Sequence, residues 1–349
     1  MRLALPILIL AIAIPLSGQS HAAEIDWAKV DTALGKTASV QGDVHRYGIP
    51  RRDLQVTVDG VTIKPALAIG GWLGFEQVAD GALVMGDLVL TETEIEPVMT
   101  KLLASGIDVT ALHNHLLRAN PTTYYVHVHA HGDPVTIATA IRATLGESKT
   151  PFGPSSIPAP QAAQIDLDRL ALDEAIGTKG KVNGGVYQFS VPRKDPVTED
   201  GTPVPPAMGT GTVVNFQPTG GGKAATTGDF VITANEVNPV IRAQNGIEVT
   251  AIHSHMLNEQ SRLFFVHFWA KDDAQQTGEG ATGQPRDDCY GEKLRRAHLN
   301  KPFLSKANRT RNIGSVDSTS QLSFNFVFRR LNAPSCGEVL PIIGSYSGG

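Results

Sequence analysis

The sequence lacks the short motifs that mark several common classes of enzyme. It has no nucleophile elbow of the α/β-hydrolases, no zinc-protease helix motif and no glycine-rich nucleotide fingerprint. The run Gly220-Gly221-Gly222 has no strand before it and helix after it, so it is expected to be a flexible turn rather than a phosphate loop.

The chain also has a small net charge and few cysteines. Charged residues are 18% of the chain and the formal net charge is −4, which argues against nucleic acid as a partner. Hydrophobic residues are 41%, a globular balance with enough apolar surface for a core. The two cysteines, Cys289 and Cys336, can pair in an oxidising compartment.

The N-terminus has the pattern of a secretion signal. Arg2 precedes an apolar run over residues 3–16, and Ser20-His21-Ala22 places small residues before a cleavage site. The run is too short for a typical membrane span, and no cysteine follows the site to carry a lipid anchor. We therefore predict a signal peptide over residues 1–22 and a periplasmic or secreted mature chain with no membrane span.

The rest of the chain is dominated by an internal repeat. Residues 106–115 read GIDVTALHNH and residues 246–255 read GIEVTAIHSH. The matching begins as early as Ile25-Asp26 with Ile165-Asp166, which makes chance similarity improbable. We predict repeat 1 over residues 23–147, a Pro- and Ser-rich linker over 148–163, repeat 2 over 164–275 and an atypical tail over 276–349.

Periodicity and capping residues predict the elements of each repeat. In repeat 1 we expect helices over 25–34, 94–105 and 134–145, and strands over 54–63, 68–76, 82–90, 107–116 and 123–130. This order predicts an α+β fold, a duplicated strand-helix-strand-strand-helix domain with mainly antiparallel sheets and helices on one face. The two repeats are expected to pack as a pseudo-twofold pair.

The repeated motif carries the candidate chemistry, because each copy contains His-x-His and a third histidine on the following strand. Side chains alternate between faces along a strand, so the histidines of one copy are expected to come within ligand reach of one another. Three imidazoles leave an open position on a bound metal, and a histidine can also act as a general acid or base. The alternative is that these histidines only hydrogen-bond to their neighbours. The candidate ligands are His113, His115, His127, His129, His253, His255 and His267, and the expected cofactor is zinc or copper as a divalent ion.

Repeat 1 has additional imidazoles. His129 and His131 share a strand face with His127, whereas repeat 2 has Trp269 and Lys271 at these positions. If metal binds, repeat 1 is therefore expected to bind it more tightly. The alternative is that His129 and His131 are solvated residues near a turn.

Two further matched pairs have two interpretations each. Asp87 and Asp229 follow a glycine in matched strands, and they either converge on the histidines or lie at a turn or bulge. Arg51 and Arg193 either bind an anion or form a surface salt bridge.

The segments NEVNPVIRAQNGIEVTAIHSHML and RLFFVHFWAKDDA closely resemble the LppY/LpqO-type bacterial envelope proteins, over about residues 24–274. The resemblance implies an exported protein of uncharacterised function, in a family that often carries a lipid anchor and is sometimes labelled peptidoglycan-binding. This chain departs from the family in lacking the lipoprotein cysteine. It also has Pro121-Thr122 where repeat 2 has Ser261-Arg262.

The tail admits two hypotheses. Residues 276–283 read QTGEGATG, and consistent codons shifted by one base encode KLAKGLR, the kind of amphipathic helix expected there. The tail is then a frameshift product, and its two cysteines are incidental. The alternative is a genuine extension.

Three functional classes follow from these observations. The favoured class is an exported, envelope-associated binding protein whose partner is a cell-envelope component or a small molecule. The alternatives are a metal-dependent enzyme and a protein that stores or senses a transition metal.

Overall fold

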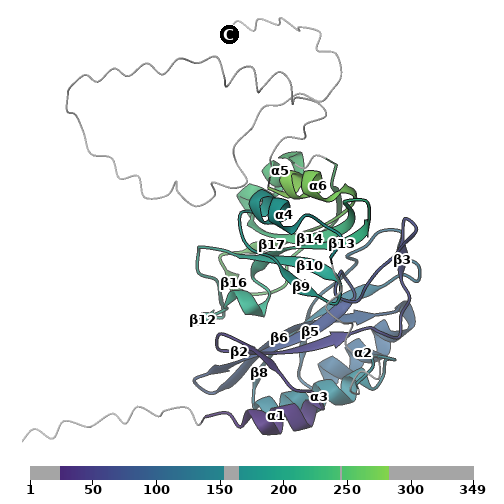
Figure 1. Cartoon of the computed structure of the whole chain (residues 1–349). Helices are drawn as coiled ribbons and strands as arrows, with labels where there is room; N and C mark the ends of the chain where they lie inside the picture. The colour runs from purple at the N-terminus through teal and green to yellow at the C-terminus, as the bar shows by residue number, and fades with distance from the viewer. Residues whose placement is uncertain (1–23, 153–164, 244–245, 283–349) are drawn as a thin grey trace, which may run out of the picture.

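The computed structural model describes residues 24–152, 165–243 and 246–282 (Figure 1). The predicted signal peptide, most of the predicted linker and the tail from residue 283 onward lie outside the described residues.

Repeat 1 forms one antiparallel sheet of six strands in the order β1-β2-β5-β6-β8-β7. Its elements are α1 (Trp27–Leu34), β1 (Ser39–Gln41), β2 (Val44–Pro50), β3 (Thr57–Val58), β4 (Val61–Thr62), β5 (Gly70–Val78), β6 (Gly81–Leu90), α2 (Glu92–Ala104), β7 (Asp108–His113), β8 (Tyr124–Gly132) and α3 (Pro134–Leu145).

Repeat 2 forms a second sheet with the matching strand order, β9-β10-β13-β14-β17-β15. Its elements are α4 (Arg169–Ile176), β9 (Lys181–Asn183), β10 (Val186–Pro192), β11 (Thr198–Glu199), β12 (Thr202–Pro203), the 3-10 helix η1 (Pro206–Met208), β13 (Gly211–Gly220), β14 (Lys223–Thr233), α5 (Ala234–Ala243), β15 (Glu248–His253), β16 (Glu259–Gln260), β17 (Leu263–Asp273) and α6 (Ala274–Ala281). The duplicated α+β fold is thus confirmed.

Two details of the sequence-based elements were wrong. The single strand expected over 54–63 is a short hairpin, β3 and β4, because Asp59 and Gly60 both have positive φ (48° and 78°) and turn the chain tightly. Strand β2 was missed, because both of its faces are covered and its sequence does not alternate.

Helix α6 begins in repeat 2 where α3 begins in repeat 1. Asp273 caps it by accepting from the backbone of Gln276, as Asp133 caps α3 by accepting from Thr136. The helix runs to Ala281 and so includes residues 276–281 of the predicted tail.

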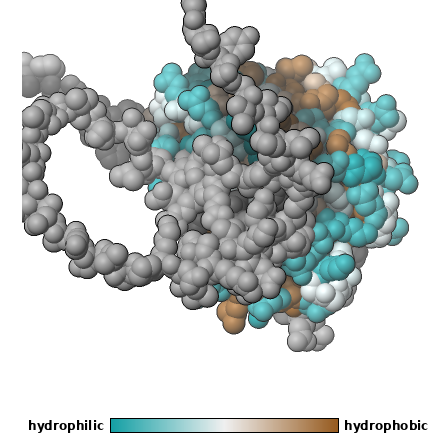
Figure 2. Space-filling view, turned by 90° about the horizontal axis from the view of Figure 1, so that it is seen from above, coloured by the Kyte–Doolittle hydropathy of each residue, from teal (hydrophilic) through white to brown (hydrophobic). Residues whose placement is uncertain are grey.

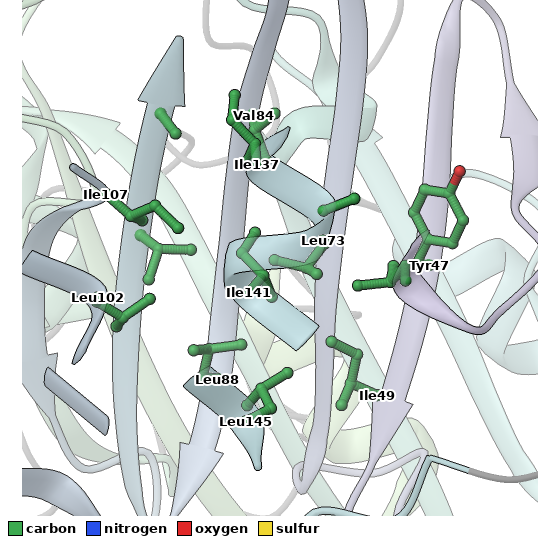
Figure 3. Close-up of a cluster of buried hydrophobic side chains, with 14 of the residues drawn as sticks. Tyr47, Ile49, Leu73, Val84, Leu88, Leu102, Ile107, Ile137, Ile141 and Leu145 are labelled. Atoms are coloured by element: carbon green, nitrogen blue, oxygen red, sulfur yellow. The ribbon is translucent and has the colours of Figure 1, made fainter. Parts of the chain in front are cut away.

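The elements stack in four layers, with the two sheets facing each other in the middle and the helices outside (Figure 1). The outer face of the first sheet packs on its helices: Leu73, Val84 and Leu88 meet Ile137 and Ile141 of α3 (Figure 3). A second core under α4 to α6 does the same for the other sheet.

Each repeat packs a segment against the other repeat across the interface between the two sheets. Val58 and Leu67, from the segment between β2 and β5, pack against Trp269 of repeat 2. Met208, from the matching segment of repeat 2, packs against Val44 and Met85 of repeat 1. This reciprocal packing agrees with the expected pseudo-twofold pairing and buries the inner face of each sheet.

The matched arginines are structural. Arg51 is completely buried and pairs with Glu94 at 2.7 Å and Asp53 at 2.8 Å. Arg193 makes the equivalent pairs with Glu236 at 3.4 Å and Asp195 at 3.2 Å. The expectation of an anion site or a surface salt bridge at Arg51 was therefore wrong. Arg51 follows β2 directly, and its guanidinium is buried against Glu94 in the first turn of α2.

Hydrophilic residues cover much of the described surface in Figure 2, with hydrophobic residues scattered among them. Within the part of the chain that the structure describes, no helix has the length and apolar character needed to cross a membrane.

Candidate metal centre

The two histidine trios meet in one cluster between the sheets. The ring centroids of His113 and His253 are 3.6 Å apart, and those of His127 and His255 are 3.8 Å apart. His115 lies 3.9 Å from His267 in the same way. The two trios, one from each repeat, come together because helices cover the outer face of each sheet and both trios lie on the inner faces.

Strand register brings an aspartate to each trio. Asp87 on β6 pairs with His127 on β8, and Asp229 on β14 pairs with His267 on β17. Paired residues of adjacent strands project to the same face. Asp87 lies 3.8 Å from His115 and 3.9 Å from His127. The interpretation in which these aspartates converge on the histidines is therefore correct, although the sequence analysis did not include them among the ligands.

The second aspartate is placed equivalently, since Asp229 lies 3.8 Å from His267 and 4.0 Å from His255. The glycine before each aspartate allows the close approach of the strands. A Cβ atom on Gly86 would stand 2.7 Å from the Trp72 carbonyl oxygen, and one on Gly228 would stand 2.5 Å from that of Val213. The repeated Gly-Asp dipeptide is the signal in the sequence that could have identified these ligands.

Many polar atoms of the cluster are buried without a hydrogen-bond partner among the described residues. They are Asp87 Oδ1, both ring nitrogens of His113, His115 Nε2, His127 Nε2, Asp229 Oδ1 and His255 Nε2. Each unsatisfied buried polar group costs about 1–3 kcal/mol. A convergent set of such atoms is therefore what a bound cation would satisfy.

Burial keeps the imidazoles neutral. Burial, together with repulsion from His253, lowers the pKa of His113 to about 2. Burial lowers the pKa of His253 to about 4 and holds those of His115, His127, His255 and His267 well below the ordinary value. Neutral imidazole is the form that binds a metal, so the histidines need lose no proton to do so at neutral pH.

The same burial acts on the carboxyl groups in the opposite direction. It raises the pKa of Asp229 to about 8. It also raises the pKa of Asp87 well above its ordinary value, with a further contribution from the charge of Asp229. A cation at the centre would oppose both shifts, because it favours the ionised carboxylate.

Surrounding groups hold the histidines in place. Tyr125 stacks on His115 and Phe265 stacks on His255, each with ring centroids 3.4 Å apart. Thr110 donates a hydrogen bond of 2.6 Å to the carbonyl oxygen of His255. Thr250 donates equivalently to the carbonyl oxygen of His115 at 2.7 Å. Each repeat thus positions the histidine segment of the other.

Several groups of three side chains in the cluster have ligand atoms that all lie within 4.8 Å of one another. These groups are His113, His115 and His127; His113, His253 and His267; His127, His253 and His255; and Asp229, His255 and His267. Imidazole and carboxylate are ordinary ligands of zinc and other transition metals, so the residues fit such an ion.

The structure does not bring His129 and His131 into the cluster. His129 is in none of these groups, and its Nδ1 lies 3.9 Å from Asp108. His131 is 45% exposed and pairs with Asp80 at 2.9 Å. The additional imidazoles of repeat 1 therefore lie outside the cluster and give no reason for tighter metal binding by that repeat.

Comparison with known proteins agrees with the duplicated architecture. A family model described as Domain of Unknown Function (DUF1259) matches the chain twice, over residues 28–147 and 170–282. The second match extends beyond residue 275, the predicted end of repeat 2. No curated protein matches the chain.

One solved structure is similar to part of the chain. It is described as the crystal structure of a trimeric bacterial microcompartment shell protein, PduB, and is 14% identical in sequence. The match covers 70% of this chain and 87% of that one, with a TM-score of 0.16.

Proposed function

The chain belongs to the family described as Domain of Unknown Function (DUF1259), and we propose that it binds divalent transition metal between its two repeats. The bound ion would be held by imidazole nitrogens and carboxylate oxygens from both sheets. Bound there, such an ion supplies a Lewis acid with positions for an outside ligand.

The unpaired polar atoms carry this proposal. Five residues of the cluster are at most 8% exposed, namely Asp87, His127, Asp229, His255 and His267. A purely structural histidine normally donates from one nitrogen and accepts at the other. Here both ring nitrogens of His113, and Nε2 of His115, His127 and His255, have no hydrogen-bond partner among the described residues. A cation is the simplest partner for neutral nitrogens and carboxylates that point at one another.

The donor set favours zinc or copper over magnesium or calcium. Imidazole suits zinc and copper, whereas magnesium and calcium prefer oxygen ligands. Six imidazoles and two carboxylates make the cluster predominantly a nitrogen site.

The setting proposed for this metal site is the cell envelope. The signal-peptide pattern of residues 1–22 and the resemblance to LppY/LpqO-type proteins support an exported protein. A binding role with a small-molecule or envelope partner fits this setting. A metal-dependent enzyme is the second candidate, because three imidazoles of the cluster, His113, His115 and His253, are only partly buried.

Elemental analysis tests the proposal. Protein stripped with EDTA, reloaded with zinc and freed of excess metal is expected to retain zinc in amounts stoichiometric with the chain. The double variant His127→Asn/His267→Asn is expected to lose it, while His131→Asn, outside the cluster, is expected to retain it. Circular dichroism checks that each variant is folded. Wild-type protein that retains no zinc or copper would contradict the proposal.

A further inference from the structure

The cluster contains more donors than one ion can use. Six histidines and two aspartates converge on the space between the sheets. A protein-bound zinc ion is almost always four-coordinate. One ion would therefore leave about half of the donors buried and unpaired, each at a cost of about 1–3 kcal/mol.

The donors also divide into two sets that share no residue. His113, His115 and His127 have ligand atoms within 4.8 Å of one another, and so do Asp229, His255 and His267. The first set comes entirely from repeat 1 and the second entirely from repeat 2.

Each set has a fourth donor beside it. Asp87 lies within 3.9 Å of both His115 and His127, so it completes the first set. His253 is the neighbouring donor of the second set: its Nε2 lies 2.7 Å from the Nε2 of His267, whose Nδ1 lies 3.8 Å from Asp229. Each set then contains three imidazoles and one carboxylate, as the pseudo-twofold relation requires.

We infer that the centre is dinuclear, with one transition-metal ion in each repeat's set of three histidines and one aspartate. This inference rests on the proposed function and adds the number of metal ions that each chain binds. The remaining groups of donors, which mix the two repeats, both need His253. One ion placed in either of them would leave Asp87 and Asp229 unused.

Charge identifies a further component. Two divalent ions bring four positive charges, and the two carboxylates cancel only two of them. A buried excess of positive charge is costly, so a small anion or hydroxide is expected to bind with the ions. His113, His115 and His253 are the partly buried members, and His113 and His253 stack on each other, so the anion is expected to enter beside this pair.

Metal counting tests the inference. Zinc-loaded wild-type protein, freed of excess metal by gel filtration, is expected to hold two zinc ions per chain by mass spectrometry of the element. His115→Asn and His255→Asn are each expected to hold one, and the control His131→Asn is expected to hold two. One ion per wild-type chain would overturn the dinuclear centre but leave the proposed function standing. No ion at all would overturn both.

Copper titration gives a second readout that needs no variant. The paramagnetic signal of bound Cu²⁺ should grow up to one equivalent, and the second equivalent should broaden or weaken it, because two ions in adjoining sets couple magnetically. A signal that saturates at one equivalent without broadening, with further copper remaining in solution, would refute two adjacent sites.

Discussion

The metal-free protein should lose stability as the pH falls below about 6.5, the ordinary pKa of histidine. In the folded chain the pKa of His113 is about 2 and that of His253 is about 4, mainly because both rings are buried. Between pH 6.5 and 5 the unfolded chain therefore takes up protons that the folded chain excludes. A group whose folded pKa is lowered in this way stabilises the fold above the unfolded pKa of 6.5, and this contribution is lost on acidification.

The magnitude follows from proton linkage. Each of these two histidines reduces the free energy of unfolding by up to about 1.4 kcal/mol per pH unit. Together they remove about 3 kcal/mol between pH 6.5 and 5, a large share of the roughly 5–15 kcal/mol that keeps a typical protein folded.

The other members of the cluster act in both directions. Asp87 and Asp229 oppose the loss, because their raised pKa values keep protons on the folded chain that the unfolded chain has released. The other four buried histidines, His115, His127, His255 and His267, add to the loss and outnumber the aspartates. The net effect is therefore destabilisation in acid.

Urea unfolding of EDTA-treated protein at pH 7, 6 and 5, followed by circular dichroism, measures this effect. The urea midpoint of the wild type should fall steadily as the pH falls. The midpoint of the double variant His113→Asn/His253→Asn should fall less, because its unfolding takes up about two fewer protons. A wild-type midpoint that stays constant from pH 7 to pH 5 would refute the buried neutral cluster.

Three further predictions concern the buried ion pair of Arg51, the bound metal and the close approach of the strands at Gly86. Arg51→Met should lower the free energy of unfolding, measured with urea, by about 3–5 kcal/mol, because it leaves the buried Glu94 without its cationic partner. Arg193→Met should cost less because Asp195 is half-exposed, and equal losses would contradict this reasoning. Zinc at one hundred times its Kd should stabilise EDTA-treated protein by about 2.7 kcal/mol per site, and an unchanged melting temperature would contradict binding. Gly86→Ala should cost about 1–3 kcal/mol and weaken zinc binding, measured by calorimetry, since its Cβ would press on the Trp72 carbonyl oxygen.

Local sequence patterns determined much of the fold. The short apolar run of residues 82–90 and the Asp133-Pro134 start of the helix over 134–145 specify their elements locally, so β6 and α3 agree closely with the prediction. The repeat likewise predicted two units with one strand order. Strand β2 was not predicted, because its sequence does not alternate: even its charged Arg46 is covered, stacking on Trp72 and donating to the Ala207 carbonyl oxygen of the other repeat.

The nature of the site was decided only by the tertiary structure. Alternation along a strand shows that His113 and His115 share a face, but it does not show what that face meets. Helix packing covers the outer faces, and the segments that each repeat packs against the other bring the inner faces together, so His113 comes to lie 3.6 Å from His253. Asp87 joins them through strand pairing with His127, a contact between residues 40 positions apart that no local pattern encodes.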